Sequence, residues 1–153
     1  MDRVCAGDAA DMTTSIRITQ HLPYPAEAVW ALIGDFGGLH RWHPRVRRLD
    51  LSWEGRIRTL HYDDGSRVVE RLEARNDAAR RYVYVLVDGA FPVASCRSTL
   101  EVRARNWHCV VAWSSEFEAP DGEEIRARAA LRLHHGQGLG ALAAALAPDA
   151  DSA

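Results

Sequence analysis

One carboxylate is a candidate for acid–base chemistry, and a guanidinium in a neighbouring strand-like segment is its candidate partner. Glu70 alternates with Val68 and Leu72, so its side chain is expected to point inward with these apolar neighbours. Burial raises the pKa of an unpaired carboxyl group, and a raised pKa suits a general acid or base. Arg58, on the preceding strand-like segment, is its best partner. The pair predicts either an acid–base site or an ion pair that only rigidifies the sheet.

A third candidate is His43, whose imidazole titrates near neutral pH and could shuttle a proton. A capping or packing role beside Pro44 is the alternative. His40 and His43 have the i, i+3 spacing of some metal ligands, but no third ligand is evident, so we expect no metal site. The glycine-rich run at 136–140 follows no strand and is not a dinucleotide fingerprint, and we expect no cofactor.

Strand alternation assigns more side chains to the interior. The residues expected inside are Cys96, Ser98, Leu100, Val102, Val111, Trp113, Ser115 and Phe117. The two serines could hydrogen-bond a ligand oxygen or simply make room, and Trp113 could line a cavity as well as fill a core. Cys96 is interpreted as a small core residue rather than a nucleophile. Alternation alone does not decide whether Tyr82 and Tyr84 or the valines between them point inward.

These side chains must be positioned by a mostly β chain. Strands are predicted at 15–21, 46–53, 56–62, 67–74, 82–87, 93–103 and 108–118. Most are joined by tight connections, of which Asp63-Asp64-Gly65 is a strong hairpin signal, so the sheet should be antiparallel.

Two helical regions complete the predicted elements. Between Pro23 and Pro44, the chain should form a helix that begins near Pro25 and a second short one over Leu39 to His43. Glu123 to Ala147 should form a long helix. Its expected inward face is Ile125, Ala129, Leu133, Gly136, Gly140, Ala143 and Leu146.

Two features of the long helix need an explanation. Glycines at 136, 138 and 140 each cost about 1 kcal/mol in a helix interior, so either the helix kinks there or close packing compensates. Adjacent residues of a helix point in different directions, so at least one of His134 and His135 is expected at the surface.

Composition excludes several classes of protein. The 153 residues suffice for one domain with a core, and the net charge of −2 gives no electrostatic case for nucleic acid. No segment is apolar enough to span a membrane, and the acidic N-terminus is not a signal peptide, so a cytoplasmic location is expected. The chain has 19 arginines and no lysine, which rules out lysine Schiff-base chemistry. Cys5, Cys96 and Cys109 are too widely spaced for a disulfide framework or a zinc site.

Three segments together resemble the helix-grip superfamily, which comprises START domains, birch-pollen-allergen-like proteins and bacterial polyketide cyclase/dehydrase-like (SRPBCC) proteins. The segments are PAEAVWALIGDFGGLHRWHP at 25–44, DDGSRVVERLEARND at 63–77 and VVAWSSEF at 110–117. The bacterial branch is the most similar. The resemblance implies an α+β helix-grip fold, in which a curved seven-stranded antiparallel sheet wraps around a long C-terminal helix. Two short helices follow the first strand, and the fold encloses an apolar pocket.

The expected domain is 13–147, with tails at 1–12 and 148–153, and translation could start at Met1 or Met12. The resemblance places Trp42-His43-Pro44 at the pocket mouth and favours Tyr84 inside. The expected catalytic residues are Glu70, Arg58 and His43. The expected ligand-binding residues are Trp42, Tyr62, Tyr84, Phe91, Cys96, Ser98, Trp113, Ser115 and Leu133.

The resemblance implies two kinds of function for such a pocket. The first is a cofactor-free lyase or isomerase of secondary metabolism that cyclises, dehydrates or isomerises a small hydrophobic, oxygenated molecule. In this enzyme Glu70 is the acid or base and Arg58 stabilises an enolate or carbonyl oxygen. The second is a non-catalytic carrier or sensor of such a molecule. A homodimer formed through a sheet edge or the long helix is an open alternative to a monomer.

Overall fold

A computed structural model describes residues 13–148 of the chain, so the expected tail at 1–12, both proposed start residues and residues 149–153 lie outside it. The strands are β1 (Thr14–Leu22), β2 (Val46–Ser52), β3 (Ile57–Tyr62), β4 (Arg67–Asn76), β5 (Arg81–Gly89), β6 (Ser95–Arg105) and β7 (His108–Glu118). The helices are α2 (Ala26–Ile33), the 3-10 helix η1 (Phe36–Arg41), α3 (Glu124–Gly140) and α4 (Leu142–Leu146).

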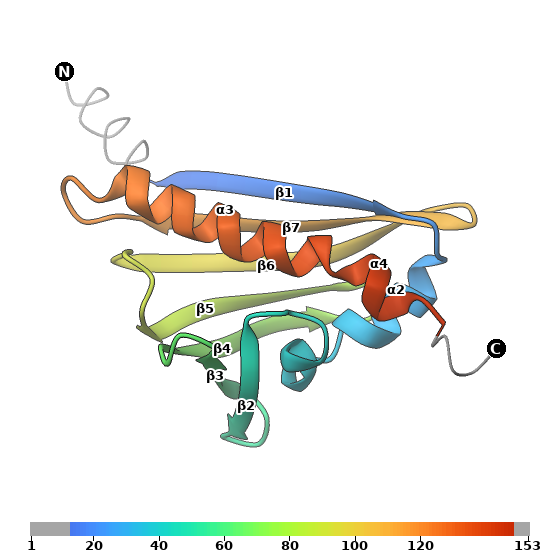
Figure 1. The fold of residues 1–153 in the computed structure, drawn as a ribbon, viewed down its shortest axis with the longest axis horizontal. Helices are drawn as coiled ribbons and strands as arrows, with labels where there is room; N and C mark the ends of the chain where they lie inside the picture. Colours follow the sequence, from blue (N-terminus) through green and yellow to red (C-terminus); the bar gives the residue numbers. More distant parts are fainter. Residues whose placement is uncertain (1–12, 149–153) are drawn as a thin grey trace.

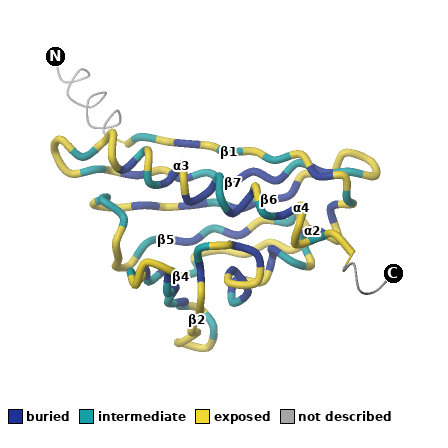
Figure 2. Tube along the Cα trace, in the orientation of Figure 1, coloured by how far each residue is buried: buried dark blue, intermediate teal, exposed yellow. Residues whose placement is uncertain are grey.

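All seven strands form one antiparallel sheet in the order β1-β7-β6-β5-β4-β3-β2. The sheet is curved, and α3 runs along it over β1, β7 and β6, while α2 and η1 lie near one end (Figure 1). Buried stretches follow the strands and the side of α3 that faces them (Figure 2). The expected α+β helix-grip architecture is therefore confirmed.

The helical region between β1 and β2 differs slightly from the expectation. α2 begins directly after Pro25, whose fixed backbone angle suits a helix start. The second helix begins at Phe36 rather than Leu39, because Asp35 caps it by accepting a hydrogen bond from Gly37 N at 2.9 Å. Gly37 and Gly38 thus lie inside η1, and Gly34 is the residue at which α2 ends.

The strand faces follow the predicted alternation. At the β3–β4 turn Gly65 has a φ of 86°, which a residue with a side chain rarely adopts. The register of this hairpin pairs Arg58 directly with Glu70. Tyr82 and Tyr84 point inward and are almost fully buried. The interior positions that alternation assigned to β6 and β7 are buried as well.

The expected inward face of the long helix is wrong. Ile125 is 85% exposed and Leu133 is 55% exposed. The buried side of α3 consists of Ala127, Leu131, His134, His135, Gly138 and Leu139. Both histidines are buried because the curved sheet covers more than one side of the helix, and residues about 100° apart can each face it. Hydropathy misplaced the face because this buried side carries two polar rings.

Both explanations offered for the glycines apply, at different positions. The expected single helix ends at Gly140, and α4 begins at Leu142. Gly138 is a close-packing site, because a Cβ atom there would lie 2.7 Å from His43 Cδ2 and 2.9 Å from Trp113 Cζ3. A Cβ atom at Gly136 would have no neighbouring atom within 4 Å.

None of the helices in residues 13–148 combines the length and apolar character that a membrane crossing requires.

Candidate functional site

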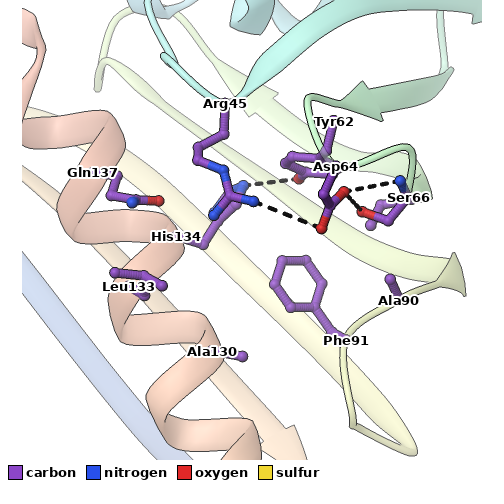
Figure 3. A pocket seen from close by; sticks show the side chains of 11 residues that line it. Arg45, Tyr62, Asp64, Ser66, Ala90, Phe91, Ala130, Leu133, His134 and Gln137 are labelled. Atoms are coloured by element: carbon purple, nitrogen blue, oxygen red, sulfur yellow. Dashed lines mark hydrogen bonds and ion pairs between the residues drawn. The ribbon is translucent and has the colours of Figure 1, made fainter.

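A cavity, called here the outer pocket, has a volume of about 190 Å³ and opens between the sheet and α3. Its lining residues are Arg45, Tyr62, Asp64, Ser66, Val68, Ala90, Phe91, Ala130, Leu133, His134 and Gln137. The helix contributes one wall, the β3–β4 hairpin a second, and the segment between β5 and β6 a third (Figure 3). Because the lining mixes apolar side chains with a few polar groups, it suits a small molecule with both characters.

Charged groups at the edge of the outer pocket are already paired with one another. Arg45 Nε donates to Asp63 Oδ1 at 2.9 Å, and its Nη2 lies 3.7 Å from Asp64 Oδ2. Asp64 Oδ1 also accepts hydrogen bonds from the Ser66 backbone and hydroxyl at 2.9 and 2.6 Å (Figure 3). A ligand charge would have to compete with these ion pairs, so the pocket favours an uncharged or weakly polar ligand.

A second cavity, called here the inner cavity, lies deeper and has a volume of about 10 Å³. Its lining residues are Glu70, Tyr84, Leu86, Phe91, Cys96, Ser98, Leu131, His134 and His135. This volume is close to the space that one water molecule needs. Phe91 and His134 line both cavities, and their rings are in edge-to-face contact at 5.3 Å. The hollow that the fold leaves is therefore divided in two by these rings.

The ion pair between Glu70 and Arg58 is buried and joins the neighbouring strands β3 and β4. Glu70 Oε1 accepts a hydrogen bond from Arg58 Nε at 2.9 Å and lies 2.8 Å from Nη2. Arg58 is held between aromatic rings, with its guanidinium carbon 4.1 Å from the centre of Phe36 and 4.7 Å from that of Tyr84. Arg58 Nη1 also donates to the Phe36 carbonyl at 3.0 Å. The guanidinium is thus fixed in position by the core.

The pKa values of this pair follow from its burial. Burial raises the pKa of Glu70, and the attraction of Arg58 only partly opposes the rise. Burial alone would lower the pKa of Arg58, but Tyr82 and Glu70 outweigh it and hold the pKa above its ordinary value. Glu70 lines the inner cavity, so its carboxyl group can meet whatever occupies that space.

His43 is buried, and both of its ring nitrogens have backbone partners. Nε2 donates to the carbonyl of His134 at 2.8 Å, and Nδ1 accepts from the backbone N–H of Arg45 at 3.2 Å. Burial lowers the pKa of His43 to about 4. His43 lines neither cavity, and this geometry favours the packing role over proton transfer.

The structure separates the expected site residues into three groups. Those at the outer pocket are Tyr62, Phe91 and Leu133. Those at the inner cavity are Glu70, Tyr84, Phe91, Cys96 and Ser98. Those that line neither cavity are Arg58, His43, Trp42, Trp113 and Ser115. Trp42 is buried against Trp113 with ring centres 5.5 Å apart, so it lies in the core rather than at a pocket mouth.

Sequence reasoning missed the two histidines of α3. His134 lines both cavities, and His135 lines the inner one. The available signal was the pair itself, two adjacent histidines that interrupt a helix of alanine, leucine and arginine. Sequence also could not place Arg45, Ala130 and Gln137 at the outer pocket, because their segments meet only in the folded chain.

In residues 13–148, no group of three or more His, Cys, Asp or Glu side chains is arranged to hold a metal ion.

Comparison with known proteins extends the resemblance seen in the sequence. A family model described as polyketide cyclase/dehydrase and lipid transport matches residues 13–147. The structure of the protein XoxI from Bacillus cereus is 31% identical, covers 87% of this chain and 95% of its own, and superposes with a TM-score of 0.83. A solution structure from Thermobifida fusca is 34% identical over 84% of this chain and 90% of its own, with a TM-score of 0.71.

More distant structures share the fold alone. The ZhuI aromatase/cyclase from Streptomyces sp. R1128 is 17% identical over 88% of this chain and 91% of its own, with a TM-score of 0.68. Among curated proteins, no sequence matches the chain. The family match covers nearly all of the described residues, and the chain belongs to the polyketide cyclase/dehydrase and lipid-transport family of the helix-grip superfamily.

Proposed function

We propose that the protein binds a small, mostly apolar molecule carrying oxygen groups and catalyses proton transfer on it without a cofactor. The reaction would be a cyclisation, dehydration or isomerisation. The observation that carries this proposal is the position of Glu70, a buried carboxyl group with a raised pKa in a cavity behind the outer pocket. A general acid or base needs both a pKa moved toward neutrality and access to a ligand.

Access to Glu70 depends on Phe91. The outer pocket, at about 190 Å³, is smaller than the ~300–1,000 Å³ typical of ligand sites. Phe91 lies in the short segment between β5 and β6 and is only half-buried, so its ring can turn away without disrupting the sheet. That movement would join the two cavities and bring a ligand to Glu70.

Each remaining group has a role in this mechanism. Val68 and Leu133 contact the apolar body of the ligand, and the hydroxyl of Tyr62 orients an oxygen group. Arg58 Nη2 is buried without a well-directed hydrogen bond, although Glu70 lies beside it. Because Arg58 lines neither cavity, its positive charge would act from behind Glu70, across the wall of the inner cavity, on the oxyanion that forms when a proton leaves carbon next to a carbonyl.

The ion pair supports a second candidate function, that of a carrier or sensor. Glu70 is held by Arg58 at 2.8–2.9 Å, and the inner cavity has room for about one water molecule. A carrier needs only the outer pocket, and its ion pair serves to rigidify the sheet. The ligand then leaves unchanged.

The test is incubation of the purified protein with an organic extract of its source cells, followed by mass spectrometry of the solution and of the protein. Glu70→Gln is run alongside, with circular dichroism to verify its fold, because the substitution leaves Arg58 without a counter-charge. A new product that requires Glu70 is the expected result. A compound retained one-to-one and released unchanged would establish the carrier instead.

A pair of tryptophan variants tests the pocket independently of Glu70. Ala130 lines the outer pocket and Ala129, its neighbour, is exposed on α3. We expect Ala130→Trp to abolish retention or turnover by filling the pocket, and Ala129→Trp to leave both intact. Equal behaviour of the two variants would overturn the assignment of the site.

A further inference from the structure

A continuous series of hydrogen bonds joins the outer pocket to the inner cavity through the two histidines of α3. Its members, called here the histidine chain, are Tyr62, His134, His135, Ser115 and Ser98. Tyr62, at one end, lines the outer pocket, and Ser98, at the other end, lines the inner cavity with Glu70. The members of the histidine chain lie on β3, α3, β7 and β6, so they come together only in the folded protein.

Every link of the histidine chain has hydrogen-bonding length. Tyr62 Oη lies 2.9 Å from His134 Nε2, and His134 Nδ1 lies 3.1 Å from His135 Nδ1. His135 Nε2 lies 2.7 Å from Ser115 Oγ, which lies 2.7 Å from Ser98 Oγ. All five side chains are buried. The series therefore has no break that a solvent molecule would need to fill.

The two imidazoles are neutral, which fixes how protons are arranged along the chain. Burial lowers the pKa of His135 to about 3, and burial with the neighbouring His43 and His135 lowers that of His134. A neutral imidazole has one N–H and one lone pair. Because the two Nδ1 atoms face each other, one must donate and the other accept, so the two histidines must be opposite tautomers.

This constraint leaves two arrangements, and they differ by the shift of one proton along each link. In the first, Tyr62 donates to His134 Nε2, His134 Nδ1–H donates to His135, and each later group donates inward. In the second, every donor and acceptor is exchanged. A proton that arrives at Tyr62 Oη can convert the first arrangement into the second, with one proton released at Ser98 and each group keeping its proton count.

If Glu70 exchanges protons, it requires a route other than its hydrogen-bond partner. In the part of the chain that the structure describes, the side chain of Glu70 hydrogen-bonds only to Arg58, whose guanidinium does not give up a proton in proteins. Glu70 also lines the inner cavity, where Ser98 is the last member of the histidine chain. One water molecule fits in that cavity and could pass a proton between them.

We propose that the histidine chain is a proton relay between the outer pocket and the inner cavity that holds Glu70. Tyr62 exchanges its proton with solvent or ligand in the outer pocket, and Ser98 delivers one toward Glu70. The relay rests on the proposed function for its purpose, since it resets an acid–base residue between turnovers. Its test requires no substrate, so relay and proposed function can fail separately.

Nuclear magnetic resonance of protein labelled with ¹⁵N-histidine tests the relay directly. We expect opposite tautomers for His134 and His135 at neutral pH. We also expect exchange of the His135 ring proton with water to be unaffected by urea below the unfolding transition, because a relay needs no opening of the structure. Identical tautomers, or exchange that urea accelerates, would overturn the proposal.

Two hydroxyl deletions locate the route. Tyr62→Phe removes the outer end, so we expect exchange at His135 to slow by about tenfold or more, because it must then wait for local opening. Ser114→Ala is the control. Ser114 lies beside Ser115 but on the opposite face of β7, and it is not a member of the histidine chain. Exchange unchanged by Tyr62→Phe, or slowed equally by both variants, would refute the assignment.

Discussion

Replacing Gly138 by alanine tests how tightly α3 packs on the core. A Cβ atom at this position would lie 2.7 Å from His43 Cδ2, 2.9 Å from Trp113 Cζ3 and 3.2 Å from Trp42 Cζ3. All three rings are at most 4% exposed, so none has free space to move into. Overpacking of this kind costs about 1–3 kcal/mol.

Gly136→Ala is the matched control, because a Cβ atom there meets nothing within 4 Å. Both substitutions gain about 1 kcal/mol of helix propensity, so Gly136→Ala should stabilise the protein by about that amount. The propensity gain cancels when the two variants are compared. The difference between them is then the packing cost alone, about 1–3 kcal/mol in disfavour of Gly138→Ala.

Equilibrium unfolding in urea measures both free energies, provided that the two variants unfold with the same dependence on urea concentration. A Gly138→Ala variant as stable as Gly136→Ala would refute the packing argument. It would mean that α3 can shift away from the aromatic rings at no cost.

Three further predictions concern the buried polar groups and the wall between the cavities. Because burial lowers the pKa of His43 to about 4 and that of His135 to about 3, from 6.5, the unfolded chain takes up protons that the folded protein does not. Stability should therefore fall by about 1–2 kcal/mol per histidine between pH 6.5 and 5, and equal free energies of unfolding at the two pH values in a variant that lacks Glu70 would contradict this. Arg58→Met should cost about 3–5 kcal/mol by leaving Glu70 unpaired, and adding Glu70→Leu should recover most of it; simply additive losses in urea unfolding would show that the pair is not coupled. Phe91→Ala should cost only about 1–2 kcal/mol, less than a fully buried phenylalanine, and should strengthen binding of indole in calorimetry by joining the cavities; unchanged affinity would mean that this ring is not the barrier.

The raised pKa of Glu70 acts on stability in the opposite direction to the histidines. A carboxyl group whose pKa is higher in the folded protein contributes its stability at low pH and loses it as the pH rises through the folded value. Comparison of acid titrations of the wild type and the Arg58→Met, Glu70→Leu variant separates this contribution from that of the histidines.

Alternation within strands was a sufficient guide to most of the sheet. The apolar neighbours of Glu70 predict its inward position, with Arg58 as its partner, and both are buried and paired across β3 and β4. The period of two works here because the sheet has a covered face and side chains can point only toward or away from it. Alternation alone did not decide whether Tyr82 and Tyr84 point inward, because the valines that alternate with them could equally form the covered face of the strand.

The long helix was a harder case for sequence. Its inward face was assigned through Ile125 and Leu133, but the buried side carries His134 and His135 instead. A hydropathy pattern cannot recognise a buried polar ring, because the partners that satisfy it lie on remote strands. Tyr62 is 72 residues from His134, and Ser115 is 20 residues from His135.

The sequence by itself determined the order of the elements, the antiparallel sheet, the superfamily and the inward position of the ion pair. The superfamily follows from the resemblance of three segments, and the other features depend on local patterns: alternation, turn residues and caps. Only the tertiary structure decided the face of α3, the division of the hollow by Phe91 and His134, and the histidine chain. Each of these requires segments far apart in the sequence to meet at hydrogen-bonding or van der Waals distance, and the curvature of the sheet around α3 sets those distances.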